Sequence, residues 1–456
     1  MRTALAAALV AMFLALNIAW LGQDRLVRDG DEEGHVGAAE MFVQDLREGN
    51  LHHFVQRSVY EDMGDYPSLY PAAVGAWWHL SGRGQPGDAP VRAVNLFFLL
   101  VCAAAVAGTA ALLGAREGAL VGGAAVLFLP LSAGLSRHFM PEGALAAAVA
   151  LAILAAAWQR RRPGWGSALL LGVALGVGFL TKQTVLLYAV VPVLVLIRPH
   201  RSLVALPVGA LVALPWALNN LGEQLDYASQ SAGYPGALSD HVLYYPQALW
   251  QPALGPVWLL LLAAALVAAG KPRGRAPVIV GLAWLVGGVV LLTFVPKKYD
   301  RLLVPLLPAA GLILAAGVQA RPRWAPVVLA GVGWTAWVSF AELSLSGPNP
   351  RAQAFHPGCV QVWLRPPVDA DLGYEAVADF ARGASPGPVR VIDAPEIDCS
   401  VQTTHGWAYH LGPYLRREGL DREVVEEGRG MVTVDFSGGP GEPVEIPLLQ
   451  SRFTLR

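Results

Sequence analysis

The stretch that decides the fold is AVNLFFLLVCAAAVAGTAALL, from Ala93 to Leu113, in which no side chain is charged. A membrane-spanning helix needs about 20 mostly apolar residues, so this segment is long enough to cross a bilayer. The whole composition points the same way, because 54% of the 456 residues are hydrophobic and 15% are charged, well below the charged fraction of a soluble protein. The sequence therefore predicts a polytopic α-helical membrane protein. Its net charge of −1 gives no reason to expect a nucleic-acid partner.

About eleven segments have this apolar character, and they form a predicted transmembrane domain over residues 1–343. Those on either side of Lys182 are short, and they fit either one long tilted helix or a re-entrant hairpin. The segments are Ala4–Leu21, Ala93–Leu113, Ala119–Leu135, Gly143–Trp158, Ser167–Leu180, Val185–Ile197, Leu203–Leu218, Leu254–Ala269, Val278–Phe294, Leu302–Val318 and Trp324–Phe340.

Arginine and lysine predict the orientation of these helices. Alternate short connections read GAREG, QRRRPGWG, RPHRS, GKPRGRAP and QARPRWA, which are rich in basic residues and almost free of acids. The positive-inside tendency places such loops in the cytoplasm, together with Arg2. The first apolar segment has no small-residue cleavage site, so we expect it to be retained as a helix. An odd number of spans then puts the C-terminus outside.

This orientation exports two large pieces of the chain. Residues 23–92 form a first loop in which we expect juxtamembrane helices, and residues 344–456 form a tail. The tail leaves the apolar pattern and reads as a strand at 388–395, an amphipathic helix at 406–419 and a second strand at 430–437. We therefore expect a small exported α/β domain at the C-terminus.

The exported tail contains Cys359 and Cys399, whereas Cys102 lies within an apolar segment. An oxidising compartment would allow the first two to form a disulfide. Two buried free thiols would explain the same residues, and the sequence leaves both arrangements open.

Polar residues that are costly near a bilayer gather on the exported side. Such residues are functional candidates by default. A site that combines carboxylates with basic groups at headgroup depth suits a lipid-linked phosphate, which Lys meets as a point charge and Arg as a bidentate fork. These residues are Asp31 and Glu32 after the first helix, Arg137, His138 and Glu142 in SRHFMPEG, Lys182 in TKQT, and Lys297, Lys298, Tyr299 and Arg301 in PKKYDR.

The order of the motifs DEEGH, YPSLYP, SRHFMPEG, GVALGVGFLTKQT and KKYDRLLVPLLP resembles the GT-C superfamily of integral-membrane glycosyltransferases. The resemblance is to the branch that contains protein O-mannosyltransferases and lipid A aminoarabinose transferases, and it covers Met1 to Val318. It implies a GT-C-like fold and the transfer of a sugar from a polyprenyl-phosphate donor to a lipid, glycan or protein acceptor. The transfer would occur on the exported face, with inversion at the anomeric carbon.

Two motifs of the family can be carried onto this chain. An Asp-Glu-x-x-Tyr pattern matches Asp31, Glu32 and His35, where His replaces the usual Tyr. A Pro-Pro-Leu stretch matches Pro67, Ser68 and Leu69, where Ser replaces the second Pro.

An inverting transfer needs a general base, and we assign this role to Asp31 with support from Glu32. A carboxylate that is partly desolvated near the interface can have its pKa raised toward the working pH. Basic residues would stabilise the phosphate leaving group, so the reaction does not strictly require a metal. The sequence leaves open whether a divalent cation also takes part. The candidate phosphate ligands are Arg137, Lys182, Lys297 and Arg301, and the candidates for shaping the substrate site are His35, Tyr66, Pro67, His138, Glu142 and Tyr299.

Several of these residues also have a purely structural interpretation. Asp29 and Glu33 are assigned to solvated loop. Glu142 follows Pro141 at a predicted helix start, where an acid is favoured by the helix dipole alone. Lys182 can extend to the interface as a snorkelling side chain.

Three other features have a structural reading of the same kind. Basic residues of KKYDR can bind anionic lipid headgroups. YPSLYP can be no more than a proline-stiffened turn. The adjacent His52 and His53 point apart on a helix or strand, so no metal site is expected there.

Two other classes of function fit part of the pattern. A transporter or flippase for a lipid-linked or anionic substrate also has many helices and buried charges, although transporter sites commonly lie near the bilayer midplane. A structural or assembly subunit would use its tail to bind envelope partners. The expected location is a bacterial inner (plasma) membrane, in contact with membrane lipids and with the site on the periplasmic side.

Overall fold

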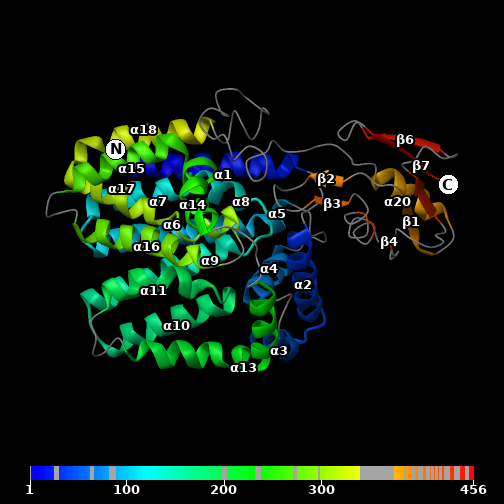
Figure 1. Ribbon diagram of the computed structural model, residues 1–456, viewed down its shortest axis with the longest axis horizontal. Coiled ribbons are helices and arrows are strands. Elements are labelled where there is room, and N and C mark those ends of the chain that lie inside the picture. Colours follow the sequence, from blue (N-terminus) through cyan, green and yellow to red (C-terminus); the bar gives the residue numbers. More distant parts are fainter. Residues whose placement is uncertain are drawn as a thin grey trace.

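The computed structural model describes residues 2–24, 30–61, 66–81, 89–197, 203–231, 238–270, 275–295, 298–338, 374–384, 387–392, 396–398, 404–406, 411, 415, 420, 424–425, 432–435, 442–446 and 451–455. Up to residue 338 these residues are mostly helical, and most of the helices run side by side in one bundle (Figure 1). The polytopic helical fold expected from the sequence is confirmed. The bundle consists of α1 (Arg2–Gln23), α6 (Val94–Leu112), α7 (Arg116–Val126), α8 (Pro130–Leu135), α9 (Glu142–Arg161), α10 (Trp165–Thr181), α11 (Val185–Leu196), α13 (Ala205–Ser231), α14 (Leu238–Ala248), η1 (Leu249–Ala253), α15 (Gly255–Ala269), α16 (Arg275–Thr293), η3 (Asp300–Leu303), α17 (Ala309–Ala320), η4 (Pro322–Trp324) and α18 (Ala325–Ala336).

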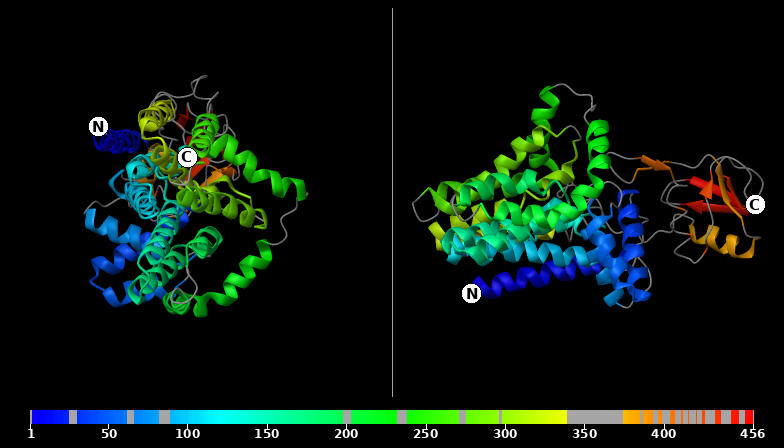
Figure 2. Two further views of the ribbon diagram at one scale, coloured as in Figure 1. Left: turned by 90° about the vertical axis from the view of Figure 1, so that its left-hand side faces the viewer. Right: turned by 90° about the horizontal axis from the view of Figure 1, so that it is seen from below.

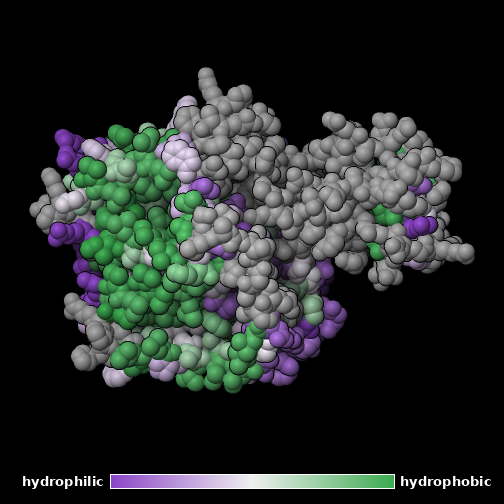
Figure 3. All heavy atoms as spheres, viewed as in Figure 1, coloured by the Kyte–Doolittle hydropathy of each residue, from purple (hydrophilic) through white to green (hydrophobic). Residues whose placement is uncertain are grey.

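Apolar side chains cover the outside of this bundle. In the space-filling view, hydrophobic residues form a broad area on the visible face, and hydrophilic residues lie at its left-hand and right-hand ends (Figure 3). Such an area is the surface that lipid chains require. Among the described residues, five helices are long and apolar enough to cross a membrane: Thr3–Gln23, Pro90–Leu112, Glu142–Arg161, Ala205–Asp226 and Arg275–Thr293.

Proline breaks two of the segments that the sequence predicted as single helices. The predicted segment Ala119–Leu135 is divided into α7 and α8, and Pro130 is the first residue of α8. The predicted segment Leu302–Val318 begins as η3, and α17 starts only at Ala309, directly after Pro308. Because proline lacks an amide hydrogen and its ring clashes with the preceding turn, a helix starts at or after it more easily than it continues through it.

Two other boundaries also differ from the prediction. Lys182 has an extended backbone and ends α10, so the single long helix across this position is excluded. Helix α13 continues past Leu218 to Ser231, so the polar residues Asn220 and Gln224 beyond the apolar segment are also helical.

Small residues bring α7 and α17 close together. A Cβ atom on Gly118 would lie 2.0 Å from the carbonyl oxygen of Ala315, and one on Gly122 would lie 2.2 Å from that of Gly311. Glycine is therefore required at both positions, as is common where membrane helices touch through their backbones. This contact holds α17 against the middle of the bundle.

The described residues of the first loop form four helices at one end of the bundle: α2 (Gly30–Arg47), α3 (Leu51–Tyr60), α4 (Leu69–Ser81) and α5 (Ala89–Arg92). Their apolar side chains form a separate core with residues of the α8–α9 region, including Tyr70, Trp78, Phe139 and Ala144. Because Phe139 and Ala144 flank the start of α9, this core fixes the loop helices against the residues that form the candidate site.

The tail contains a mixed sheet of five strands in the order β4-β1-β5-β7-β6. β1 runs parallel to β4 and β5, whereas β7 is antiparallel to β5 and β6. Helix α20 (Tyr374–Gly383) packs on the sheet through Val377 and Ala381. The strands are β1 (Val389–Ile392), β4 (Val424–Val425), β5 (Val432–Asp435), β6 (Glu442–Ile446) and β7 (Ser451–Leu455), with a separate hairpin of β2 (Glu396–Asp398) and β3 (Thr404–Gly406).

The expected small α/β domain is therefore present, and β1 and β5 occupy the two predicted strands. In the predicted helix 406–419, Leu411 and Leu415 are helical and buried, whereas Gly406 ends β3. Cys359 and Cys399 lie outside the described residues. The sheet lies beyond the end of the bundle that carries α2, and the two chain termini lie at opposite ends of the molecule (Figure 2).

Candidate functional site

The connection between α8 and α9, residues 136–141, is held by three other elements. The Nε of Arg92 donates to the carbonyl oxygen of Arg137 over 3.1 Å, and the Nδ2 of Asn95 donates to that of His138 over 2.5 Å. The amide of Phe139 donates to Oε1 of Glu32 over 2.6 Å. Residues from α2, α5 and α6 thus fix the backbone that leads into α9.

Glu142, the first residue of α9, lies at the centre of a buried group of charges. Its Oε1 is 2.8 Å from the Nζ of Lys182, which ends α10, and 4.0 Å from the Nε of Arg301 in η3. The side chains of Glu142, Lys182 and Arg301 are 1%, 5% and 15% exposed. Two cations share one carboxylate, so these three side chains together carry a net charge of +1.

Aromatic rings surround these two cations. The Nζ of Lys182 is 4.6 Å from the centre of the Tyr66 ring, and the guanidinium of Arg301 is 4.9 Å from that of Tyr299. Both distances are typical of cation–π contacts. The ring of His35 lies 6.0 Å from that of Tyr66. Three of the residues predicted to shape the substrate site, Tyr66, Tyr299 and His35, therefore lie around the basic pair or next to it.

Besides Glu142, which is described above, Pro67 and His138 are the remaining members of that predicted set. Pro67 is buried beside Tyr66, just before α4. His138 is buried in the α8–α9 connection, where its Nδ1 lies 3.2 Å from Oε1 of Glu32.

Glu32 is buried in the first turn of α2, and its carboxylate is paired. Burial alone would raise the pKa of Glu32, but a set of attractions led by His138 outweighs burial and lowers the pKa from 4.5 to about 2. The folded protein thus surrounds the Glu32 carboxylate with partners that stabilise its charged form, whereas the raised pKa expected for the base Asp31 stays a prediction.

A second ionic group, which the sequence analysis did not predict, contacts the α8–α9 connection. Arg92 and Asp24 form a buried ion pair with an NH2 to Oδ2 distance of 2.9 Å. The guanidinium of Arg92 lies 5.3 Å from the centre of the Trp20 ring, and the guanidinium of Arg137 lies 4.9 Å from it. The Nε of Arg137 also donates to Oδ1 of Asn17 over 2.8 Å. The structure thus places Arg137 against α1, whereas Lys182 and Arg301 gather at Glu142.

The one sign of this group in the sequence is the position of two of its members. Asp24 directly follows the first apolar segment, and Arg92 directly precedes the second. Both positions are also typical of ordinary interfacial charges, so the pattern alone does not pair them.

Two lysines, for which the sequence also allowed contact with the membrane surface, have partners inside the protein. Lys182 is buried against Glu142, so it does not snorkel to the interface. Lys298 donates to the carbonyl oxygens of Leu292, Thr293 and Val295 at the end of α16. These bonds tie Lys298 to a helix C-terminus, where a cation is favoured, and the lipid-headgroup interpretation is wrong for this residue.

Some of the predicted site lies outside the described residues. Asp31 belongs to the first turn of α2, but its side chain is not described, and neither is that of Glu33. Asp29 and Lys297 lie outside the described residues altogether. The roles predicted for Asp31 and Lys297 therefore stay predictions.

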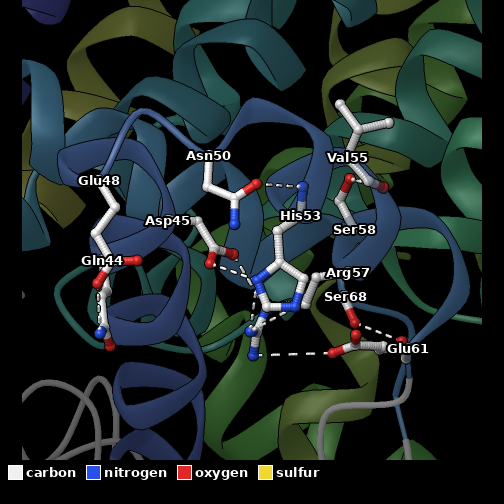
Figure 4. A network of polar contacts seen from close by, with 10 residues as sticks. All are labelled: Gln44, Asp45, Glu48, Asn50, His53, Val55, Arg57, Ser58, Glu61 and Ser68. Atoms are coloured by element: carbon white, nitrogen blue, oxygen red, sulfur yellow. Dashed lines mark hydrogen bonds and ion pairs between the residues drawn. The ribbon is translucent and has the colours of Figure 1, made fainter.

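His53 has partners that explain it without a metal. Its Nδ1 lies 2.8 Å from Oδ1 of Asp45, and the Nε of Arg57 donates to Oδ2 of the same carboxylate over 3.1 Å. Figure 4 shows these side chains pointing toward one another. An NH1 of Arg57 also lies 3.8 Å from Oε2 of Glu61. The network joins α2 to α3. In the part of the chain that the structure describes, no three His, Cys, Asp or Glu residues are grouped so that they could hold a metal ion.

Comparison with known proteins supports the resemblance seen in the sequence. Residues 77–202 match the family model described as dolichyl-phosphate-mannose-protein mannosyltransferase (PMT), and this segment includes Arg92, Arg137, Glu142 and Lys182. No curated protein sequence matches the chain.

The fold is similar to that of solved structures, among them the following three. ArnT from Cupriavidus metallidurans in the apo state superposes with a TM-score of 0.62 at 16% identity, over 99% of this chain and 98% of that chain. The same protein bound to undecaprenyl phosphate gives 0.61 at 15% identity, over 100% and 98%. The Archaeoglobus fulgidus oligosaccharyltransferase, in complex with Zn and sulfate, gives 0.51 at 10% identity, over 92% and 62%. The chain therefore shares the fold of ArnT over 99% or more of its length.

Proposed function

We propose that this chain, a membrane protein with the GT-C fold, is an inverting glycosyltransferase. It moves a hexosyl or pentosyl group from a polyprenyl-phosphate donor to a lipid, glycan or protein acceptor. The observation that carries the proposal is the buried group of Lys182, Arg301 and Glu142, which lies where α9 and α10 meet the loop helices in a chain with the ArnT fold. The site faces the periplasmic side of a bacterial inner membrane.

The charges of the buried group fit the phosphate of such a donor. Lys182 and Arg301 together carry two positive charges and Glu142 carries one negative charge, which leaves +1. A sugar phosphodiester carries one negative charge, so its binding brings the group to neutrality. When the sugar leaves, the phosphate becomes a monoester with more negative charge, and buried cations that are already in place stabilise that change. Lys297, next to the Lys298–Arg301 segment in sequence, is a further proposed ligand of this phosphate.

The transfer itself needs a base on the acceptor side. Asp31 takes the proton of the acceptor hydroxyl as its oxygen attacks the anomeric carbon, and the bond to the phosphate oxygen breaks with both electrons going to the phosphate. Glu32 has a different duty, because its low pKa makes it a weak base while its bond to Phe139 holds the α8–α9 connection. This scheme requires no metal ion.

The transporter alternative accounts for less of what is observed. It explains buried charges and many helices, but the match of residues 77–202 to the PMT family model favours a transferase. Lys182, Arg301 and Glu142 also gather where α9 begins and α10 ends, and Lys182 contacts Tyr66 of the first loop.

A reconstitution experiment tests the proposed function. The purified full chain in lipid vesicles is incubated with polyprenyl-phosphate sugars and candidate acceptors, and the release of polyprenyl phosphate is measured by mass spectrometry. We expect release by the wild-type protein and much slower release by Lys182→Met. Movement of intact donor across the vesicle membrane without any release would instead establish the flippase function.

A further inference from the structure

Two buried polar atoms beside the charged group lack a partner. Within the described part of the chain, Oε2 of Glu142 and the hydroxyl of Tyr188 form no hydrogen bond. Both residues are 1% exposed. The other oxygen of Glu142 is occupied by Lys182, so one carboxylate presents both a satisfied and an unsatisfied acceptor.

The two atoms belong to the same region of the molecule. Tyr188 lies on α11, which begins directly after the turn that contains Lys182. Helix α11 packs against α9, the helix that begins at Glu142. Tyr66 faces the Nζ of Lys182 at 4.6 Å. Glu142 therefore presents its unsatisfied oxygen within the group to which the donor phosphate is assigned, and Tyr188 lies on a helix that packs against α9.

Unpaired groups of this kind are rare in folded proteins. Nearly all buried polar atoms find a partner, because water can no longer compensate for a lost hydrogen bond. Two such atoms near one basic pair are explained if a ligand supplies their partners. The carboxylate oxygen can only accept a hydrogen bond, whereas the tyrosine hydroxyl can donate or accept.

The charge of the site limits what that ligand can be. Lys182, Arg301, Glu142 and the phosphodiester of the donor already sum to zero. A neutral hydroxyl can donate to Oε2 of Glu142 and leave this balance unchanged. An ammonium group would add a positive charge beside Lys182 and Arg301, and an uncompensated buried charge is strongly unfavourable.

We propose that Oε2 of Glu142 and the hydroxyl of Tyr188 form a sugar subsite that binds hydroxyl groups of the donor and selects a neutral sugar over an amino sugar. This inference rests on the proposed function, and it adds two specificity-determining residues and a substrate class.

The variant Tyr188→Phe tests the subsite, because it removes the hydroxyl and keeps the ring. Binding is measured for two lipids, polyprenyl phosphate and a neutral-sugar polyprenyl phosphate, on the full chain in detergent. We expect the affinity for the sugar-bearing lipid to fall about 3-fold to 10-fold, as for one lost neutral hydrogen bond. The affinity for polyprenyl phosphate should stay unchanged. Tyr60→Phe, at an exposed position on α3, is the matched control.

A merely structural role for Tyr188 predicts a different outcome. It would lower the affinity for both lipids and the thermal midpoint, whereas loss of an unpaired hydroxyl should leave the midpoint unchanged or higher. Equal affinities of Tyr188→Phe and wild type for the sugar-bearing lipid would overturn the subsite.

The sugar class is tested with the wild-type protein and a pair of donors that differ only in a hydroxyl or an amino group at one ring position. We expect faster release of polyprenyl phosphate from the neutral donor, by at least 10-fold. A preference for the amino sugar would overturn the inference while leaving the proposed function intact. Release from neither donor, with polyprenyl phosphate still bound, would overturn the proposed function instead.

Discussion

The carboxylate of Glu142 and the ammonium group of Lys182 form a buried ion pair across 40 positions of sequence, with Oε1 and Nζ 2.8 Å apart. This contact joins the start of α9 to the end of α10. Arg301, 4.0 Å from the same oxygen, adds a second cation from a third part of the chain. The pair therefore has two separable roles, one in holding helices together and one in presenting positive charge to an anion.

Removing one partner of the pair should cost more stability than removing both. We expect Lys182→Met to lose about 3–5 kcal/mol, because it leaves a buried carboxylate short of a partner. Adding Glu142→Gln should restore much of this loss in thermal unfolding. The double variant should still bind the polyprenyl-phosphate donor about 10-fold to 150-fold more weakly, as for one lost charge-assisted hydrogen bond of about 1.5–3 kcal/mol.

Arg160→Ala, on the exposed end of α9, is the control and should change neither quantity. Wild-type donor affinity in the double variant would remove Lys182 from the phosphate site.

The pair of Arg92 and Asp24 should be a main contributor to stability. Both side chains are almost fully buried, and Arg92 also holds the carbonyl of Arg137. We expect Arg92→Met to lower stability by about 3–5 kcal/mol in thermal or denaturant unfolding. Arg162→Ala, at an exposed position, should stay within about 0.5 kcal/mol of wild type. An Arg92→Met protein as stable as the control would show that the pair contributes nothing net.

The contrast between Arg92 and Lys182 shows what a sequence of this kind can predict. The apolar segments and the polar connections can be read directly, because lipid imposes length and composition on each span by itself. Lys182, Glu142 and Arg301 were therefore identified as unusual, and the structure brings the three together. The partner of each residue could not be read, since ion pairs join positions far apart in the chain.

Rules that consider one residue or one short segment at a time do not reveal such distant partners. The rule that an acid caps a helix start describes Glu142 correctly, but it does not reveal Lys182 as its partner. An argument from desolvation alone could not predict the pKa of Glu32, because burial in this fold brings His138 and the amide of Phe139 with it. In the tail, short strands such as β6 and β7 have little pattern of their own, and their pairing depends on contacts along the whole domain.

The low pKa of Glu32 makes a prediction about pH. A carboxyl group whose pKa falls from 4.5 to about 2 on folding stabilises the native state above pH 4.5, and this contribution is lost as the pH falls toward 2. Glu32→Gln lacks the titrating group. We therefore expect the difference in thermal midpoint between wild type and Glu32→Gln to shrink as the pH falls from about 4.5 to about 2. A difference that stays constant over this range would show that the pKa of Glu32 is not lowered.

The arginine-rich connections predict that the tail is exported. A phosphatase fused after Arg456 should be active, and a fluorescent protein at the same place should not fluoresce, because each reporter folds on one side of the membrane. The same reporters placed after Arg162, in a connection predicted to be cytoplasmic, should give the opposite result. A fluorescent fusion and an inactive phosphatase after Arg456 would place the tail in the cytoplasm. The predicted number of spans and the side of the membrane assigned to the site would then both be wrong.

The most direct test of the mechanism is the substitution Asp31→Asn, which keeps the size of the side chain and removes its basic lone pair. We expect sugar transfer to fall by roughly 10²-fold to 10⁴-fold, the usual range for general-base catalysis, while donor binding persists. Asp29→Asn and Glu33→Gln serve as controls and should be nearly silent, because we assign both residues to solvated positions.

Glu32→Gln separates the two acidic neighbours. If Glu32 only positions the α8–α9 connection, this variant should lose stability and part of its activity. The acidic limb of its pH–rate profile should remain, since a group with a pKa of about 2 does not titrate in that range. Asp31→Asn should abolish that limb. Normal transfer by a folded Asp31→Asn protein would exclude Asp31 as the base, and loss of the acidic limb in Glu32→Gln alone would assign the base to Glu32.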